Sequence, residues 1–187
     1  MTVSEYGKCV TRGECSDYQL NGYEWIGQAY RESNYCNWGN PVRGTHPLNC
    51  VDWSQASAYC AWIGGRLPTE SEWEYAAKSS GKPIIYPWGN TKPDCSRAVT
   101  KDEGGSGCGK DRTWAVCEKR AGNTQRGLCD MAGNVWEWTS SRYSSGQSNR
   151  VLRGGSFNPN EGSLRSSDRY GLMPKYRSYL GGFRCAQ

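Results

Sequence analysis

Residues 127–143 read GLCDMAGNVWEWTSSRY, and this stretch decides the fold. Trp136 and Trp138 are two residues apart, with Glu137 between them. In an extended strand both indoles therefore lie on one face and the carboxylate lies on the other. The sequence predicts a strand with one core-facing side and one polar side.

A tight turn is expected just before this strand. Asp130 and the Gly133-Asn134 pair place a carboxylate and exposed backbone carbonyls close to Glu137. Such oxygen atoms are the ligands that Ca²⁺ prefers. The alternative is an ordinary turn followed by an amphipathic strand, and spacing alone favours it, because the full pattern of a calcium-binding loop is missing.

Length and composition predict one loop-rich globular domain. The 187 residues suffice for a single core, nine Trp and twelve Tyr concentrate burial in large side chains, and 24 Gly indicate many turns. The net charge of +5 comes without a basic stripe, so no nucleic-acid partner is expected. No apolar run has bilayer length, and the first residues lack the order of a secretory signal. We expect no membrane span and a monomer.

Ten cysteines predict disulfides, because their number is even and no pair has the CxxC spacing of zinc sites. Disulfides indicate an oxidising compartment, extracellular or at the cell surface, or a thermophilic cytosol. The alternative is that several, such as Cys60, are buried free thiols, since Cys packs as a small hydrophobe. The connectivity stays open. His46 is the single histidine, so neither a histidine-based metal site nor a catalytic triad is expected.

Two main helices are expected before the central strand. Residues 53–63 carry apolar side chains at helical spacing and are followed by paired glycines. The second helix follows Thr69, which forms a capping box with Glu72. A shorter helix-like pattern lies within residues 2–22. The fold class expected is α+β, with two helices, small antiparallel sheets and much irregular loop.

Three glutamates, Glu70, Glu72 and Glu74, open the second helix. Neighbouring carboxylates are also the groups of general acid–base catalysis. We favour a structural role, because carboxylates in the first turn complement the helix dipole and are routine at helix starts.

Residues 150–187, called the final segment below, carry the predicted binding surface. In the loop between its two strand-like ends, Arg165, Arg169 and Arg177 recur among Ser, Asn, Tyr and Gly. The guanidinium groups are expected to buttress the fold through carbonyls and carboxylates. The remaining side chains have the composition of adaptable binding surfaces. The alternative is a solvated connecting loop with buried arginines.

Five ordered motifs resemble one known family. In order they are LNCVDWSQASAYCAWIGGRLPTESEWEYAA, YPWGN, GLCDMAGNVWEWTSSRY, RVLRGGSF and GFRCA. Together they are similar to the formylglycine-generating enzyme (sulfatase-modifying factor) family, whose domain is a variant of the C-type lectin fold. The resemblance covers most of the chain, and it implies that the family's amino-terminal strands are absent or shortened here. It implies a single C-type lectin-like domain over residues 1–187.

The resemblance also implies a structural calcium site. Asp130, Glu137 and the carbonyls of Gly133 and Val135 match the ligands of a family calcium site. A second family calcium site expects Asn near the position of Val99, so it is not carried over.

Copper is not expected. Formylglycine-generating enzymes bind copper through two cysteines shortly after the GGS motif, because thiolates suit copper(I). Here no cysteine lies between Cys129 and Cys185, and His46 alone cannot form the histidine cluster of iron-dependent relatives. The oxidase activity of the family is therefore not transferred to this chain.

The final segment is similar to the variable proteins of diversity-generating retroelements, which share this fold and diversify solvent-facing residues for ligand binding. The likeness rests on RGGSF, the recurring arginines and the closing GFR, and on many positions with residue types reachable by mutating asparagine codons. The ligand-binding positions that this implies are Asn158, Asn160, Ser163, Ser166, Asp168, Tyr170, Gly171, Leu172, Met173, Lys175, Tyr176, Ser178, Tyr179 and Leu180.

We therefore predict a non-enzymatic protein that binds a protein or cell-surface ligand. Aromatic and apolar anchors should dominate its affinity, and these are Tyr170, Leu172, Tyr176, Tyr179 and Leu180. One alternative is a fixed accessory or sensor domain, because non-diversified members share the arginine framework. The other is an enzyme of the family with a site that does not use copper. Calcium is expected to stabilise the fold without taking part in chemistry.

Overall fold

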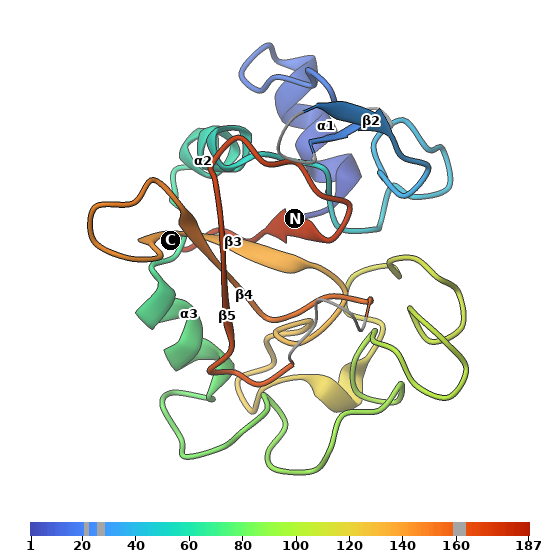
Figure 1. Ribbon diagram of the computed structural model, residues 1–187, viewed down its shortest axis with the longest axis vertical. Helices are drawn as coiled ribbons and strands as arrows, with labels where there is room; N and C mark the ends of the chain where they lie inside the picture. Colours follow the sequence, from blue (N-terminus) through green and yellow to red (C-terminus); the bar gives the residue numbers. More distant parts are fainter. Residues whose placement is uncertain (21–22, 26–28, 159–163) are drawn as a thin grey trace.

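The computed structural model describes residues 1–20, 23–25, 29–158 and 164–187 (Figure 1). Two of its helices are the predicted ones, α2 (Trp53–Trp62) and α3 (Glu70–Ala77). The predicted capping box of α3 is present, because the Thr69 side chain accepts a hydrogen bond from the Glu72 backbone amide and the Glu72 carboxylate accepts one from the Thr69 backbone amide. Both main helices are thus confirmed.

A third helix, α1 (Val3–Thr11), exceeds the two that were expected. The helix-like pattern near the start of the chain is enough to form it, since Thr2 and Glu5 build another capping box. The helix buries Val3 and Tyr6 against the main core. A short 3₁₀ turn, η1 (Arg120–Gly122), lies in the long loop region that follows α3.

The central sheet has four strands in the order β5-β4-β3-β6. Their bounds are Trp136–Arg142 for β3, Arg150–Arg153 for β4, Arg169–Leu172 for β5 and Gly181–Phe183 for β6. In a separate two-stranded sheet, β1 (Tyr23–Trp25) pairs antiparallel with β2 (Tyr30–Glu32). The antiparallel expectation is wrong for one pair, because β3 and β6 are parallel. The chain returns after β5, so β6 joins the sheet running in the direction of β3 (Figure 1).

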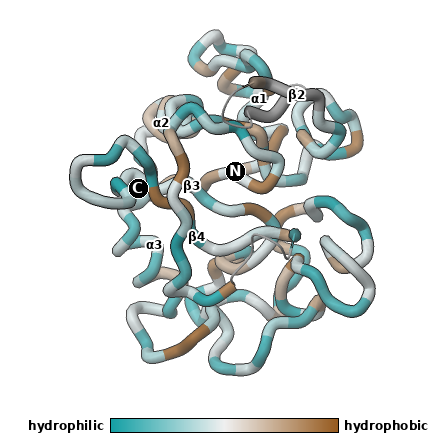
Figure 2. Tube along the Cα trace, in the orientation of Figure 1, coloured by the Kyte–Doolittle hydropathy of each residue, from teal (hydrophilic) through white to brown (hydrophobic). Residues whose placement is uncertain are grey.

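The alternation predicted for β3 is confirmed. Trp136 and Trp138 belong to the main core with residues of α1 and α2, and the Trp138 indole donates to the carbonyl of Val51 at 3.0 Å. Figure 2 shows hydrophobic positions along α2 and the strands and mostly hydrophilic surrounding loops. The opposite face of β3 is polar but not solvated, because Glu137 is only 5% exposed and lies beneath Trp73 of α3.

The turn before β3 requires its glycine. Gly133 has φ +81°, in the left-handed region, and a Cβ atom there would lie 2.5 Å from the carbonyl oxygen of Val99. Asn134 follows with φ 65°, and its backbone N–H donates to the carbonyl of Val99 at 2.8 Å. The predicted tight turn is therefore anchored on a distant loop.

All ten cysteines form disulfides, so the free-thiol alternative is wrong. The pairs are Cys9–Cys15, Cys36–Cys50, Cys60–Cys185, Cys95–Cys108 and Cys117–Cys129. Five disulfides are typical of proteins from an oxidising, extracellular environment. Within the described ranges, no helix has the length and apolar character needed to cross a membrane.

Candidate functional site

Arg153 connects three parts of the chain that meet at the final segment. It ends β4, and its side chain is only 1% exposed. Its Nη1 donates to Glu70 at 3.1 Å and to the Ser167 carbonyl at 2.9 Å. Its Nη2 donates to Glu74 at 2.6 Å and to the Ser166 carbonyl at 2.6 Å. One buried guanidinium thus joins β4, α3 and the loop that leads into β5.

Two further arginines of the final segment repeat this arrangement. Arg169 of β5 makes a bidentate pair with Glu70, with distances of 2.8 and 2.7 Å. Arg177 is 6% exposed and donates to Asp52 at 2.6 Å and to Gln55 at 3.1 Å, both at the start of α2. The predicted buttressing role is confirmed for these two residues.

Arg165 does not share that role. Its side chain is exposed and makes no hydrogen bond or ion pair within the described part of the chain. The buttressing expectation is therefore wrong for Arg165.

Glu70 and Glu74 do more than start a helix. They carry the negative charge that holds Arg153 and Arg169, a role that sequence spacing did not indicate. Burial opposes ionisation of Glu74, but Lys78 and Arg153 outweigh it, so the pKa of Glu74 is below its ordinary value. A carboxylate kept ionised by two cations is unsuited to act as a general acid, which agrees with the structural role that we favoured.

The predicted ligand-binding positions differ in exposure. Tyr170 and Lys175 are exposed, whereas Ser166 and Leu180 are buried. Asn160 and Ser163 lie outside the described residues. The remaining positions are half-buried, and they are Asn158, Asp168, Gly171, Leu172, Met173, Tyr176, Ser178 and Tyr179.

Packing restricts three of these positions. Ser166 is fully buried, and its amide donates to the Ile85 carbonyl at 2.8 Å. Leu180 is 3% exposed and is part of the main core. Gly171 has no room for a side chain, because a Cβ atom there would lie 2.6 Å from the Tyr143 ring. Their residue types fitted a diversified surface, but packing against distant residues decides their burial.

One aromatic group lies along β5. Tyr170 is 42% exposed, and its ring centroid lies 5.8 Å from that of buried Trp136. Tyr143, directly after β3, is 37% exposed, and the Arg169 guanidinium lies 4.6 Å from its ring centroid. Alternation along β5 places Tyr170 on one face and Arg169 with Gly171 on the other.

A second aromatic group surrounds Tyr179. Its ring centroid lies 5.0 Å from that of Tyr35 and 6.0 Å from that of Phe157. Tyr35 is 39% exposed. Sequence reasoning missed Tyr35 and Tyr143 as surface residues because both lie outside the final segment. Tyr143 does belong to the stretch that decided the fold, whereas Tyr35 is in an irregular segment without a motif.

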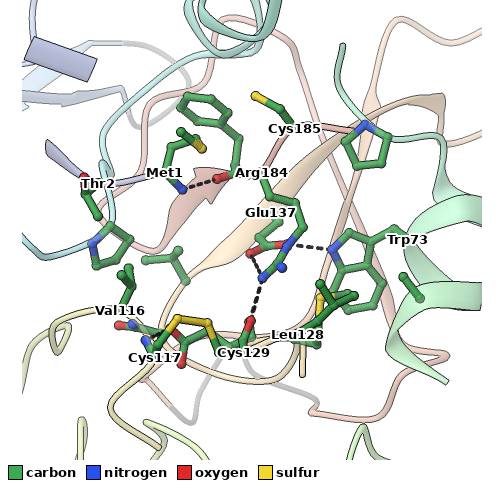
Figure 3. Close-up of a pocket in the computed structure, with 18 of the residues that line it drawn as sticks. Met1, Thr2, Trp73, Val116, Cys117, Leu128, Cys129, Glu137, Arg184 and Cys185 are labelled. Carbon is green, nitrogen blue, oxygen red and sulfur yellow. Dashed lines mark hydrogen bonds and ion pairs between the residues drawn. A yellow bond between two sulfur atoms is a disulfide. The ribbon is translucent and has the colours of Figure 1, made fainter. Parts of the chain in front are cut away.

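The expected calcium ligand Glu137 has other partners (Figure 3). Its Oε2 accepts from Arg184 Nε at 2.5 Å and from Trp73 Nε1 at 2.6 Å, and its Oε1 accepts from Arg184 Nη2 at 2.8 Å. Arg184 Nη2 also points at the carbonyls of Cys129 and Asp130, at 3.0 and 3.3 Å. These groups line a cavity of ≈ 370 Å³.

A guanidinium therefore stands among oxygen atoms that the resemblance gives to calcium. A carboxylate has about four acceptor positions, and three of those of Glu137 are filled. Asp130 is also engaged, since its Oδ2 accepts from the Cys117 amide at 2.7 Å, and burial raises the pKa of Asp130. The residues in this arrangement do not fit a calcium ion, which would have to displace Arg184. Calcium binding by Asp130, Glu137 and the carbonyls of Gly133 and Val135 is thus an untested implication of the resemblance, and the position of Arg184 argues against it.

A chelator experiment tests the calcium site. A cation bound only by the native state must raise the Tm, so its removal by EDTA must lower the Tm. We expect EDTA to leave the Tm unchanged, because Arg184 already neutralises Glu137. Differential scanning calorimetry in EDTA and in calcium chloride measures this effect, with magnesium chloride as the control. A Tm that rises only with calcium would contradict the expectation and show that Arg184 yields its place to the ion.

Comparison with known proteins gives one family. Residues 1–187 match the sulfatase-modifying factor enzyme 1-like domain. The chain is 42% identical over 149 residues to a Mus musculus protein named inactive C-alpha-formylglycine-generating enzyme 2, covering 75% of this chain and 48% of that protein. It is 34% identical over 166 residues to the Mus musculus formylglycine-generating enzyme, covering 80% of this chain and 43% of the enzyme. The chain thus spans about half the length of the curated relatives it matches.

A solved structure gives the fold. Treponema denticola variable protein 1 superposes with a TM-score of 0.67 at 21% identity, covering 97% of this chain and 80% of that one. A likeness at this identity shows the fold alone. It confirms the predicted C-type lectin-like fold of the formylglycine-generating enzyme subtype.

Proposed function

Since this chain belongs to the sulfatase-modifying factor enzyme 1-like family, we propose that it is a non-catalytic member that binds a protein ligand through its final segment. The surface that we propose consists of Tyr170, Lys175, Tyr176 and Tyr179 of the final segment, together with Tyr143, which lies outside the segment but beside Arg169. The proposal extends to a surface diversified between copies of the gene, as in the variable proteins named above.

The cysteines support the absence of copper oxidase chemistry. Copper(I) needs soft thiolate ligands. No cysteine lies in the stretch between Ser156 and Cys185, where the resemblance places the copper pair, and every cysteine of the chain is in a disulfide. The 42% identity with a protein named inactive agrees with this proposal.

The observation that carries the proposal is how the final segment is held. Carboxylates at the starts of α2 and α3 form ion pairs with Arg153, Arg169 and Arg177. The two helices therefore hold the final segment in place. Between these anchors, Tyr170 and Lys175 have exposed side chains and Tyr176 is half-buried. A surface whose supports are internal can change its outer side chains without loss of the fold, as binding surfaces on rigid scaffolds do.

The chemistry of this surface favours a protein partner. Tyrosine offers a large contact area and a polar hydroxyl at low entropic cost, and tyrosine and arginine are enriched among interface hot spots. Tyr170 and Tyr143 are more than a third exposed, yet both are already supported, by Trp136 and by Arg169. Such preorganisation lowers the cost of binding.

Sequencing of natural copies tests the proposal. We expect substitutions in the final segment to fall on Tyr170, Lys175, Tyr176 and Tyr179, because their side chains reach the surface. Deep sequencing of the coding region for residues 150–187 in the source population, with the flanking DNA, measures this. A template repeat and a reverse transcriptase gene should lie nearby.

The tightly packed positions are the control within the same data. Ser166, Gly171 and Leu180 should stay constant, because packing leaves no space for other side chains. Substitutions spread evenly over buried and exposed positions would contradict the assignment of the surface. A final segment that is invariant in all copies would instead favour a fixed accessory or sensor domain.

A further inference from the structure

A second cavity lies outside the final segment, between the loop at residues 42–46 and the loop at residues 110–118. Its volume is ≈ 270 Å³. The lining residues that matter here are Arg43, His46, Lys110, Arg112, Trp114 and Glu118. Nothing in the sequence motifs indicated this site, because both of its loops lie outside the five motifs.

The cavity has an excess of positive charge. Arg43, Lys110 and Arg112 face a single carboxylate, that of Glu118. Arg43 is only 9% exposed, and it donates to the Asn37 side chain at 3.1 Å and not to an acid. Among the described residues, no ion pair includes any of these three cations. The arginines of the framework, by contrast, each have a carboxylate partner.

Trp114 forms an apolar wall with more positive charge around it. Lys110 Nζ lies 3.6 Å from its ring centroid, and Lys119 Nζ lies 3.8 Å from it. The indole is fixed in place, because its Nε1 donates to the Gly107 carbonyl at 2.8 Å and its backbone amide donates to Asn134 at 3.2 Å. Two ammonium groups at one ring attract the ring but repel each other, and a bound anion would relieve that repulsion.

The pKa of His46 reflects the positive electrostatic potential in the cavity. Its Nδ1 lies 2.9 Å from the hydroxyl of Thr113. Burial lowers the pKa of His46, and the charges of Arg43 and Arg112 lower it further. Lys110 acts in the same direction, and Glu118 opposes them. The imidazole thus lies among uncompensated positive charges, in a place where an anion would favour its protonation.

We propose that this cavity binds a doubly charged oxyanion, a sulfate or phosphate group, between Arg43, Lys110 and Arg112. The guanidinium fork matches the oxygen geometry of such groups, and several cations together suit two negative charges better than the single charge of a carboxylate. Trp114 provides an apolar wall that the organic part of an esterified ligand can contact. A free ion and a phosphate monoester on a sugar share this chemistry.

The unique histidine provides the experiment. Sodium sulfate, sodium phosphate and a sugar monophosphate are titrated into the full chain at constant ionic strength, and the His46 ring signals are followed by NMR. We expect a saturable shift with at least one of these probes and a rise in the pKa of His46 on saturation. Because protonation adds a fourth cation to the site, binding should tighten as the pH falls through that pKa.

A double variant separates a built site from general charge effects. Lys110→Gln with Arg112→Gln should weaken binding about tenfold or more, because charge-assisted hydrogen bonds to the anion are lost. Both side chains are exposed, so the fold should persist, and the Tm checks this. The control Lys92→Gln removes an exposed charge outside the cavity and should leave the affinity unchanged. Unsaturable shifts with all three probes, or equal affinity in the double variant and wild type, would overturn the proposal.

Discussion

Replacing both Cys60 and Cys185 by serine should lower the free energy of unfolding by about 5 kcal/mol, because this disulfide closes the longest loop. The two cysteines are 125 residues apart, and they tie α2 to the end of the chain beyond β6. The chain-entropy model attributes the effect to the larger freedom of the unfolded chain without the bond. Urea unfolding monitored by circular dichroism measures it.

The pair Cys9–Cys15 is the matched control. It closes a loop with a separation of only 6, so its double serine variant should lose about 2 kcal/mol in the same model. Both bonds have a fully buried member, Cys60 in one and Cys9 in the other, so loss of packing is similar. Equal losses for the two variants would contradict the role of loop length and indicate that local packing dominates.

Replacing Arg153 by alanine should cost about 3–5 kcal/mol, because removal of one partner leaves buried polar groups without compensation. The groups affected are Glu70 and Glu74, which are partly exposed, and the buried carbonyl of Ser166. The same variant should release the loop before β5, so hydrogen exchange of the Arg169 amide is expected to increase.

Two controls accompany this variant. Arg165→Ala removes an exposed arginine from the same loop and should change stability by less than about 0.5 kcal/mol. Arg153→Lys keeps the charge but loses the planar fork, so its loss should be intermediate. If Arg153→Ala and Arg165→Ala were equally stable, the framework would not support the final segment.

The cost of Arg153→Ala should also depend on pH. The pKa of Glu74 is lowered in the folded state, so its contribution is present above the pKa of the unfolded state. That contribution is lost as the pH falls through the folded pKa. The difference in unfolding free energy between wild type and variant should therefore shrink below about pH 4. Urea unfolding at several pH values measures this difference.

The sequence by itself determined the local elements of this protein. The spacing of Trp136 and Trp138 determined the faces of β3, and the capping box of Thr69 and Glu72 determined the start of α3. An even number of cysteines indicated disulfides. These properties depend on neighbours within a few residues, so spacing and residue type are enough to predict them.

The tertiary structure alone decided how these elements meet. Cys60 finds Cys185 at a separation of 125, and Glu137 takes Arg184 and Trp73 as partners, 47 and 64 residues away. In the final segment, exposed Tyr170 and buried Leu180 are equally compatible with the local pattern. Burial and charge pairing depend on which distant side chains share the same space. Without a regular period, an irregular loop carries no local signal of those neighbours.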